Sequence, residues 1–384
     1  MPLKVLIAPD KFKGTLTAHA AAEAIARGWH AARPLDRLDL LPISDGGDGF
    51  GEILSRLLAA QPQRLKTVDA AGRPLAATWW WESKSRTAII ESARIIGLAL
   101  LPPGKFHPFQ LDTRGLAAAF SAAARKGARL CLVGIGGSAT NDGGFGLARA
   151  LNWQLLDHEG KTIERWTELH RLALLQPPAK KFGFKVLIAV DVQNRLLGAR
   201  GCSRIYGPQK GLRPQDFSAA EKCLRSLSTA VQKQLGRASA SELGSGAAGG
   251  LGFGLHAFMG GQLVSGFDLL ARHAQLGRHL RGTDLAITGE GALDRSTLMG
   301  KGVGELALLC KQRRITCIGL AGRVDDHALL HPLFAEARGL TQITTPKESI
   351  REPARYLEKL AELVARDWRT SERSHSTFRR TLGR

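Results

Sequence analysis

The stretch 132-LVGIGGSATNDGGFG-146 decides the fold class of this chain of 384 residues. The apolar run Ala128–Val133 leads into it and predicts a buried strand, and Gly146–Leu151 predicts a short helix after it. Strand, glycine-rich loop and helix form the unit from which parallel α/β sheets are built. Gly134, Gly136 and Ala139 also match the G-x-G-x-x-G/A spacing of a dinucleotide-binding turn. The loop therefore predicts either a nicotinamide site or a site for another phosphate.

The dinucleotide interpretation has one further feature in its favour and two against it. A second apolar run, Trp153–Leu156, ends at Asp157, about where a ribose-binding carboxylate would stand. However, residues 141–144 (Asn-Asp-Gly-Gly) place a polar break where the Rossmann helix would run. Hydride transfer would also leave the other glycine-rich loops of the chain without a function. An NAD-dependent dehydrogenase of a small hydroxy acid is therefore kept only as the alternative.

The same rhythm of strands and helices extends along most of the chain. Strands are predicted at 4–8, 38–43, 185–190, 285–288 and 316–320, and helices at 17–29, 50–59 and 214–234. Residues 65–91 instead predict antiparallel strands at 67–68, 77–81 and 87–91, with a turn at Gly72–Arg73. We therefore expect an α/β fold with two domains and the active site in the cleft between them. Sheet-forming segments at both chain ends predict one domain from 1–65 plus 285–384 and another from 66–284, with a frayed basic tail over about 369–384.

The composition narrows the class of protein. Lys and Arg number 54 against 34 Asp and Glu, a net charge of +20, but the basic residues are scattered and no aromatic residues are interleaved with them. We therefore expect no nucleic-acid partner. The five cysteines lack C-x-x-C spacing, which argues against a zinc site and against disulfides. No apolar run reaches membrane-spanning length and no signal peptide is recognisable, so a cytoplasmic protein without a membrane partner is expected.

Five polar or glycine-rich loops follow the carboxyl ends of predicted strands, where open α/β sheets bind their ligands. These loops are 10–17, 44–49, 134–146, 191–201 and 288–294. The first offers lysines beside a helix N-terminus, which suit a phosphate but also fit a capped helix with solvated lysines. The second has paired carboxylates that suit Mg²⁺ or a polyol, although Asp-Gly is also ordinary turn chemistry. The last gathers Glu290, Asp294, Ser296, Thr297 and Lys301 within a dozen residues.

A further glycine-rich segment, 244-GSGAAGGLGFG-254, holds neither a carboxylate nor a lysine. It offers backbone N–H groups, the material of an anion-binding nest. It does not match the Walker A motif, which excludes a P-loop NTPase. Carboxylates, lysines and backbone nests together indicate phosphoryl transfer, which depends on positioning and on charge neutralisation.

The ordered motifs IAPDKFKGTLTA, SDGGDG, GIGGSATNDGG, DVQNRLLG, YGPQKG, GSGAAGGLG and TGEGALDRSTLMGK resemble those of the type-1 glycerate kinases, from near residue 5 to near residue 322. The resemblance implies phosphorylation of D-glycerate with ATP and Mg²⁺, giving 2-phosphoglycerate, with 3-phosphoglycerate as the alternative product. It also implies a Rossmann- or flavodoxin-like domain with a parallel sheet and a second α/β domain. Lys11, Asp48 and Arg195 depart from residues that are frequent in the family.

The motif positions give the site residues that we expect. The catalytic residues are Asp191, Asp294 and Lys13, with Asp191 preferred as the base because it ends a short buried strand, and Asp294 second. Glycerate would be bound by Asp45, Gly46, Gly47, Asn141, Asp142 and Asn194. ATP and its phosphates would be bound by Asp10, Lys11, Gly136, Gly137, Ser138, Lys210, Gly246, Gly249, Gly250 and Lys301, and Mg²⁺ by Glu290 and Asp294. D-glycerate and ATP are the expected partners, and homo-oligomerisation is left open.

Overall fold

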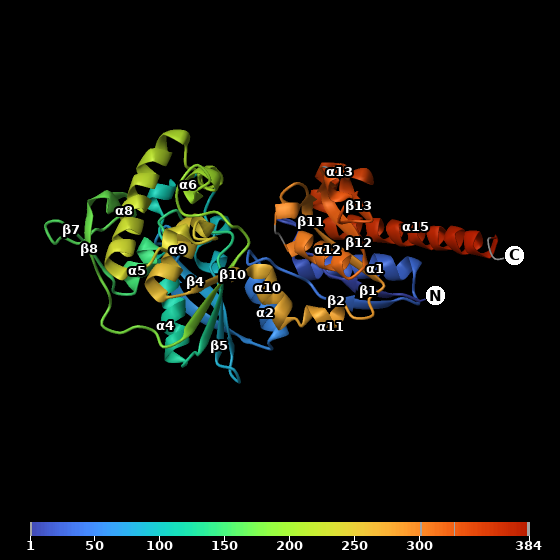
Figure 1. The fold of residues 1–384 in the computed structure, drawn as a ribbon, viewed down its shortest axis with the longest axis horizontal. Helices are drawn as coiled ribbons and strands as arrows, with labels where there is room; N and C mark the ends of the chain where they lie inside the picture. The colour runs from blue at the N-terminus through green and yellow to red at the C-terminus, as the bar shows by residue number, and fades with distance from the viewer. Residues whose placement is uncertain (1, 300–301, 326, 382–384) are drawn as a thin grey trace. The chain divides into compact units, whose positions relative to one another are not determined.

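The computed structural model describes residues 2–299, 302–325 and 327–381, and it divides into two compact units. Unit 1 combines residues 1–44 with 270–384, and unit 2 comprises residues 45–269. Figure 1 shows blue and orange-red segments, from the two ends of the sequence, side by side in unit 1. Residues 45–65 and 270–284 thus fall in the opposite unit to the one that we expected from the sequence.

Unit 1 is built on a parallel sheet of five strands in the order β13-β12-β11-β1-β2. Its strands are β1 (Lys4–Ile7), β2 (Arg37–Leu40), β11 (Leu285–Leu293), β12 (Thr316–Val324) and β13 (Glu336–Gly339). Numbered along the chain within the unit, this order is 2-1-3-4-5, the order of flavodoxin-like sheets. The parallel-sheet fold that we expected for this part of the chain is therefore confirmed.

Helices α1 (Ala18–Ala32) and α15 (Pro353–Thr381) pack against each other and contribute to the core of unit 1. Gly28 permits this approach, because a Cβ there would come within 1.9 Å of the Glu358 carbonyl oxygen. The buried Trp29 donates from Nε1 to Asp36 Oδ2 over 2.9 Å. We expected a frayed basic tail over about 369–384; the described backbone of this segment is helical to Thr381, and residues 382–384 lie outside the described residues. Once packing has nucleated a helix, each further residue adds a hydrogen bond at little entropic cost.

Strands β11 and β12 are longer than the sequence predicted. Residues 288–294 were expected to form a loop, but β11 continues to Leu293, pairing Glu290 with Ala321 and Leu293 with Val324. Glycine makes this possible, because a Cβ at position 289 would lie 1.8 Å from the Leu320 carbonyl oxygen. Glu290 therefore stands on a hydrogen-bonded strand, which fixes its backbone.

Unit 2 contains a mixed sheet of six strands in the order β10-β9-β6-β5-β4-β3. The strands β5 (Thr87–Glu91), β6 (Leu130–Gly134), β9 (Lys185–Val190) and β10 (Gln262–Ser265) are parallel. β3 (Gln61–Val68) and β4 (Pro74–Glu82) add antiparallel pairs, and Gly72 lies in the turn between them with φ +77°. The expected mixed sheet and its turn are confirmed.

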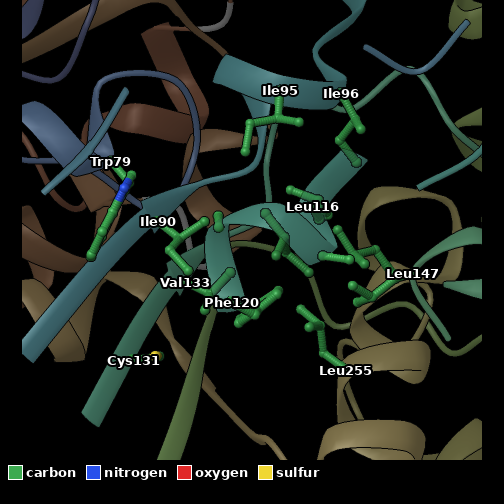
Figure 2. Close-up of a cluster of buried hydrophobic side chains, with 14 of the residues drawn as sticks. Trp79, Ile90, Ile95, Ile96, Leu116, Phe120, Cys131, Val133, Leu147 and Leu255 are labelled. Atoms are coloured by element: carbon green, nitrogen blue, oxygen red, sulfur yellow. The ribbon is translucent and has the colours of Figure 1, made fainter. Parts of the chain in front are cut away.

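Both faces of this sheet are covered. Figure 2 shows one face, where Ile90 and Val133 project from the strands among Leu116, Phe120 and Leu147. On the other face, Ile89, Leu132 and Ala189 form a second cluster with Phe50 and Leu54 from α2 (Phe50–Leu57). Alternate residues of one strand thus serve opposite cores, as the two-residue period of a strand requires. This double burial holds the carboxyl edge of the sheet rigidly in place.

The remaining helices connect these strands. They are α3 (Ala93–Ile96), α4 (Ala117–Arg125), α5 (Phe145–Ala150), α6 (Cys202–Ile205), α7 (Gly207–Lys210), α8 (Phe217–Leu235), α9 (Ala247–Met259), α10 (Gly266–His273), α11 (Leu276–His279), α12 (Gly302–Gln312), α13 (His327–Leu330) and α14 (Pro346–Arg351). None of the helices in the described part of the chain has the length and apolarity needed to cross a bilayer.

The segment that resembled the second half of a dinucleotide site is arranged differently. β7 (Gln154–Asp157) pairs with β8 (Leu172–Gln176) in a separate antiparallel sheet rather than extending the six-stranded one. Asp157 accepts hydrogen bonds from the N–H groups of Glu159 and Lys161 in a local turn. The helix after the glycine-rich loop begins only at Phe145. In the described segment 130–157, the strand that follows α5 therefore does not join β6 in a parallel sheet, as a nicotinamide site of this type requires.

Candidate functional site

In unit 1 the predicted residues gather where β1 and β11 end. Flavodoxin-like sheets bind ligands at this pair of strands, because the chain crosses to opposite faces there. The Asp10 N–H donates to the Gly289 carbonyl over 2.8 Å, and the Lys11 N–H donates to Asp10 Oδ1 over 2.6 Å. A Cβ at Gly291 would lie 3.2 Å from the backbone nitrogen of Lys13. The loop 10–17 and the end of β11 are therefore in contact.

Lys13 sits on a tight hairpin. Phe12 and Leu16 exchange backbone hydrogen bonds of 2.9 and 3.0 Å, and Gly14 makes the turn with φ +79°. Phe12 is buried and anchors the hairpin, whereas Lys13 is exposed. Thr17 then caps α1 by accepting from the Ala20 N–H over 3.1 Å. The hairpin presents the ammonium group of Lys13 to solvent at the carboxyl edge of the sheet.

The Thr297 hydroxyl joins the carboxylate of Glu290 to the backbone N–H of Asp294, the two residues that we assigned to a metal. Thr297 Oγ1 donates to Glu290 Oε1 over 2.8 Å and accepts from the Asp294 N–H over 3.2 Å. Ser296 donates to Asp294 Oδ1 through both its N–H, over 2.7 Å, and its hydroxyl, over 2.5 Å. Lys301, also predicted for this site, lies outside the described residues.

Carboxylate and hydroxyl oxygens of this kind suit Mg²⁺, which commonly takes one or two protein carboxylates and completes its shell with water and phosphate. Over the described ranges, no group of three or more His, Cys, Asp and Glu side chains is placed to hold a metal ion by itself.

In unit 2 the loop 45–49 lies across the carboxyl edge of the six-stranded sheet. A Cβ at Gly46 would come within 2.9 Å of the Ala189 carbonyl oxygen at the end of β9. The Gly136 N–H donates to the Gly46 carbonyl over 3.1 Å, which joins this loop to the one after β6. The Gly47 N–H donates to Asp45 Oδ1 over 3.2 Å. Loops 44–49, 134–146 and 191–201 thus meet at one edge, as the sequence led us to expect.

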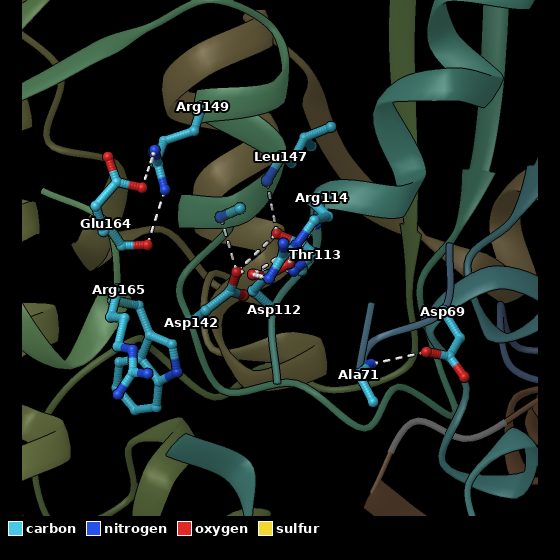
Figure 3. A network of polar contacts seen from close by, with 12 residues as sticks. Asp69, Ala71, Asp112, Thr113, Arg114, Asp142, Leu147, Arg149, Glu164 and Arg165 are labelled. Atoms are coloured by element: carbon cyan, nitrogen blue, oxygen red, sulfur yellow. Dashed lines mark hydrogen bonds and ion pairs between the residues drawn. The ribbon is translucent and has the colours of Figure 1, made fainter. Parts of the chain in front are cut away.

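Asp142 is fully buried and its carboxylate is satisfied within the chain. Figure 3 shows it among Thr113, Leu147 and neighbouring backbone groups. Oδ2 accepts from the N–H and hydroxyl of Thr113 over 2.9 and 2.8 Å and from the Gly146 N–H over 2.9 Å, and Oδ1 accepts from the Gly144 N–H over 3.2 Å. Burial raises the pKa of this carboxyl to about 6. This arrangement fits a residue that positions the loop better than one that binds substrate.

Glu91, at the end of β5, was missed by the sequence analysis. It is buried, and it accepts from the Gly49 N–H over 3.1 Å and from the Gly51 N–H over 2.9 Å. Burial raises its pKa, and the nearby Arg94 opposes this rise. A carboxylate at the end of an expected buried strand, beside the glycine-rich loops, was the signal that could have identified it.

Several glycines that we assigned to phosphate binding serve chain packing instead. The N–H groups of Gly136, Gly246 and Gly250 donate to carbonyls of Gly46, Asn194 and Gly246 over 3.1, 2.8 and 3.3 Å. At Gly249 a Cβ would lie 1.9 Å from the Thr140 carbonyl oxygen, so the two glycine-rich segments touch through their backbones. The segment 244–254 is not an open loop either, because α9 begins at Ala247 and residues 248–250 form a left-handed turn within it. The N–H groups of Gly136, Gly246 and Gly250 are therefore engaged within the chain in this structure.

A buried ammonium group, that of Lys210, contacts the loop 134–146. Lys210 Nζ donates to Ser138 Oγ over 3.1 Å and to the Thr140 carbonyl over 2.7 Å. Burial lowers the pKa of Lys210 to about 8. The neighbouring Asn141 donates from Nδ2 to Ser203 Oγ over 2.9 Å, while its Oδ1 and the hydroxyl of Thr140 are buried without a hydrogen bond. Buried polar atoms that lack partners commonly mark a site that a ligand or water completes.

Asp191 follows directly after β9 and is half-buried. Burial, together with the charge of Asp191, raises the pKa of Tyr206 to about 12. The Tyr206 hydroxyl donates to Asn194 Oδ1 over 2.5 Å, and Asn194 Nδ2 donates to the Arg200 carbonyl over 2.8 Å. Asn194 therefore braces its own loop, and Tyr206, which we did not predict, stands beside the expected base.

Comparison with known proteins places this arrangement in a family. Residues 5–369 match the model of the glycerate kinase family. The chain belongs to the glycerate kinase family. Relatives named glycerate kinase from Halalkalibacterium halodurans and Bacillus subtilis are each 32% identical to it, with 94% of this chain and 97% of each relative covered. A relative from Escherichia coli named glycerate 2-kinase is 34% identical, with 91% of this chain and 93% of the relative covered.

A solved structure agrees with this placement. The chain superimposes with a TM-score of 0.80 on a crystal structure that carries the name glycerate kinase 2, from Salmonella typhimurium LT2, at 29% identity, covering 97% of this chain and 100% of the other. The family resemblance and the α/β fold predicted from the sequence are thereby confirmed.

This member of the glycerate kinase family carries its predicted site residues in two sets. Unit 1 brings together Asp10, Lys11, Lys13, Glu290 and Asp294, and unit 2 brings together Asp45, Gly46, Gly47, Gly136, Gly137, Ser138, Asn141, Asp142, Asp191, Asn194, Lys210, Gly246, Gly249 and Gly250. Glu91, Thr113, Ser203 and Tyr206 join the second set through the contacts described above.

Proposed function

We propose that this chain transfers the γ-phosphoryl group of ATP to the 2-hydroxyl of D-glycerate and releases 2-phosphoglycerate. The observation that carries the proposal is the family match over residues 5–369. The name glycerate 2-kinase of the Escherichia coli relative favours the 2-hydroxyl over the 3-hydroxyl. 3-Phosphoglycerate is the alternative product.

Unit 2 offers the groups that the acceptor needs. From the sequence we assigned Lys210 and Ser138 to the phosphates of ATP. Their place beside Asn141, which we assigned to glycerate, also suits the carboxylate of a small hydroxy acid, because Coulomb attraction is stronger in a buried environment. Asp191 is the proposed base. Its strand ends in a doubly buried sheet, so its backbone is fixed, and a carboxylate accepts the hydroxyl proton late in phosphoryl transfer.

Unit 1 offers the groups that the phosphates need. Lys13 and Lys11 supply positive charge next to Asp10 at the β1–β11 switch point. Glu290 and Asp294, with the Thr297 hydroxyl between them, are the residues that would hold Mg²⁺. When bound, the ion would neutralise phosphate charge.

The test is an enolase-coupled assay with D-glycerate and ATP-Mg²⁺. Enolase consumes 2-phosphoglycerate directly, so signal without added phosphoglycerate mutase identifies the 2-phosphorylated product. Signal that appears only when mutase is added would assign 3-phosphoglycerate. ADP formation that does not depend on glycerate, with no enolase signal in either arm, would overturn the proposed function.

A further inference from the structure

A dense group of basic side chains occupies the amino-terminal edge of the unit 2 sheet, at the opposite ends of the strands from the candidate site. Eight exposed lysines and arginines come from the three segments that lead into β5, β6 and β9. They are Lys84, Arg86, Arg125, Lys126, Arg129, Lys180, Lys181 and Lys185, and we call them the basic edge.

The fold brings these segments into direct contact although 101 residues of sequence separate the first from the last. The Arg129 N–H donates to the Arg86 carbonyl over 2.9 Å, and the Lys185 N–H donates to the Arg129 carbonyl over 2.9 Å. The backbones of these three residues are therefore about 5 Å apart in succession, the spacing of strands in a sheet. Arg86 also reaches the next turn, since a Cβ at Gly127 would come within 2.1 Å of its Nη2.

The basic edge has almost no negative charge of its own. Glu82 is the single acidic residue in the segments 82–87, 125–130 and 180–185. Elsewhere in unit 2 many arginines pair with carboxylates, for example Arg73 with Asp69 at 2.6 Å and Arg204 with Glu221 at 2.9 Å. No member of the basic edge is ion-paired within the described ranges.

Mutual repulsion among unpaired cations costs folding stability. Eight of them converge at this edge from segments that are distant in the sequence, with Glu82 as the single carboxylate in those segments. An external polyanion would remove the repulsion on binding. Within unit 2, the basic edge lies at the opposite ends of the strands from Asp191 and the loops 45–49 and 134–146, so the site residues of this unit do not account for it.

We propose that the basic edge binds the sugar–phosphate backbone of a single-stranded nucleic acid, which reverses the expectation that we drew from the scattered basic residues of the sequence. Two aromatic rings lie among the cations: Trp81, with Lys126 Nζ 5.9 Å from its ring centre, and Phe182, stacked on Phe184 at 4.9 Å. Both rings are only partly buried. Cations interleaved with accessible aromatic rings are typical of surfaces that bind single strands by phosphate contacts and base stacking. A membrane surface fits less well, because these described segments expose no large aliphatic side chain.

The test compares binding of a fluorescein-labelled 20-nucleotide oligouridylate by anisotropy between 50 and 200 mM salt. The variant R86Q/R129Q/K185Q removes three charges from the basic edge. It should bind at least about tenfold more weakly than wild type, and the slope of log K against log salt should become shallower by about 2, since each lost phosphate contact removes about 0.7. Oligothymidylate should behave in the same way, and duplex DNA should bind more weakly than either.

The matched control is K222Q/R225Q/K233Q, which removes three exposed charges from α8. It should bind the oligonucleotide within about twofold of wild type, and both variants should keep wild-type kinase activity. The Tm of R86Q/R129Q/K185Q should be no lower than that of wild type, because the variant relieves repulsion within the basic edge. Equal weakening by both triples would show a diffuse effect of net charge and would overturn the proposal. Unchanged binding by R86Q/R129Q/K185Q would overturn it too, as would stronger binding to duplex DNA, to poly-glutamate or to phosphatidylserine vesicles.

Discussion

Glu91 and Asp142 hold the N-termini of two different helices in the same way. Each buried carboxylate accepts from the N–H groups of both glycines of a Gly-Phe-Gly sequence: Gly49 and Gly51 at the start of α2, and Gly144 and Gly146 at the start of α5. The first glycine of each sequence is left-handed, with φ +89° and +78°. Two helices of unit 2 thus begin with the same kind of cap, a Gly-Phe-Gly sequence bound by a buried carboxylate, at the carboxyl edge of the sheet.

The cap at Asp142 predicts a specific dependence of stability on pH. Its folded pKa of about 6 lies above the ordinary value of 3.8, so the folded state retains this proton as pH rises while the unfolded chain loses it. The contribution of Asp142 to the free energy of unfolding should therefore fall between about pH 4 and pH 6, by about 3 kcal/mol at most. Denaturant unfolding of wild type and Asp142→Asn across this range measures the effect. A stability difference that does not change with pH would contradict it.

Asp191→Asn should lower kcat by about 100-fold or more, with a much smaller change in KM for glycerate. The amide keeps the shape of the side chain but cannot accept a proton. Tyr206→Phe, which removes the neighbouring hydroxyl, serves as the comparison and should affect kcat far less. If Asp191→Asn stays active while Asp294→Asn is inactive, Asp294 is the base.

Lys13→Ala should lower kcat by about tenfold or more while the protein stays folded. The ammonium on the exposed hairpin would counter charge that redistributes on the transferred phosphoryl group. Lys347→Ala, which removes another exposed lysine of unit 1, should leave kcat unchanged. A raised KM for ATP with normal kcat in Lys13→Ala would instead assign Lys13 to ground-state binding.

Deprotonation of Lys210 should make kcat/KM fall on the alkaline side of its pH profile. Because its pKa is lowered to about 8, the ammonium loses its proton as pH rises through that value, and kcat/KM should fall there. The unfolded chain holds this proton up to about pH 10.5, so native stability should rise between pH 8 and 10.5. Lys210→Met should be at least tenfold less active and should lack this alkaline fall. Persistence of the fall in this variant would assign it to another group.

The dinucleotide-like spacing at 134–139 should not bind a nicotinamide. Titration with NADH should give no saturable fluorescence enhancement, whereas ATP with Mg²⁺ should raise Tm, because a ligand that binds only the folded state stabilises it. The physical reason is that α5 begins only at Phe145, several residues after the glycines at 134–139. In addition, Asp157 belongs to the separate β7–β8 sheet, where it is not placed to bind a ribose. Micromolar affinity for NADH would contradict this expectation.

The sequence by itself determined the fold class, most of the strands and most of the loops, whereas β8, β10 and β13 were not predicted. Runs such as Lys185–Val190 are buried on both faces, so their apolar composition marks them without knowledge of the partners. Asp10, Asp191 and Glu290 could also be identified from the sequence, because each lies on a strand or shortly after one. Local composition was sufficient wherever burial imposes a simple pattern.

Only the tertiary structure decided what those residues do. Glycines 136, 246 and 249 could bind phosphate or allow chain packing, and their neighbours, which are distant in sequence, showed packing. From the sequence alone, Asp142 would be taken for an exposed polar residue of a loop, but in the structure it is fully buried. In the sequence, Arg86, Arg129 and Lys185 are far apart and look like scattered charges. In the structure, backbone hydrogen bonds place them side by side. Burial and electrostatic environment depend on contacts between distant segments, so a local sequence pattern does not contain them.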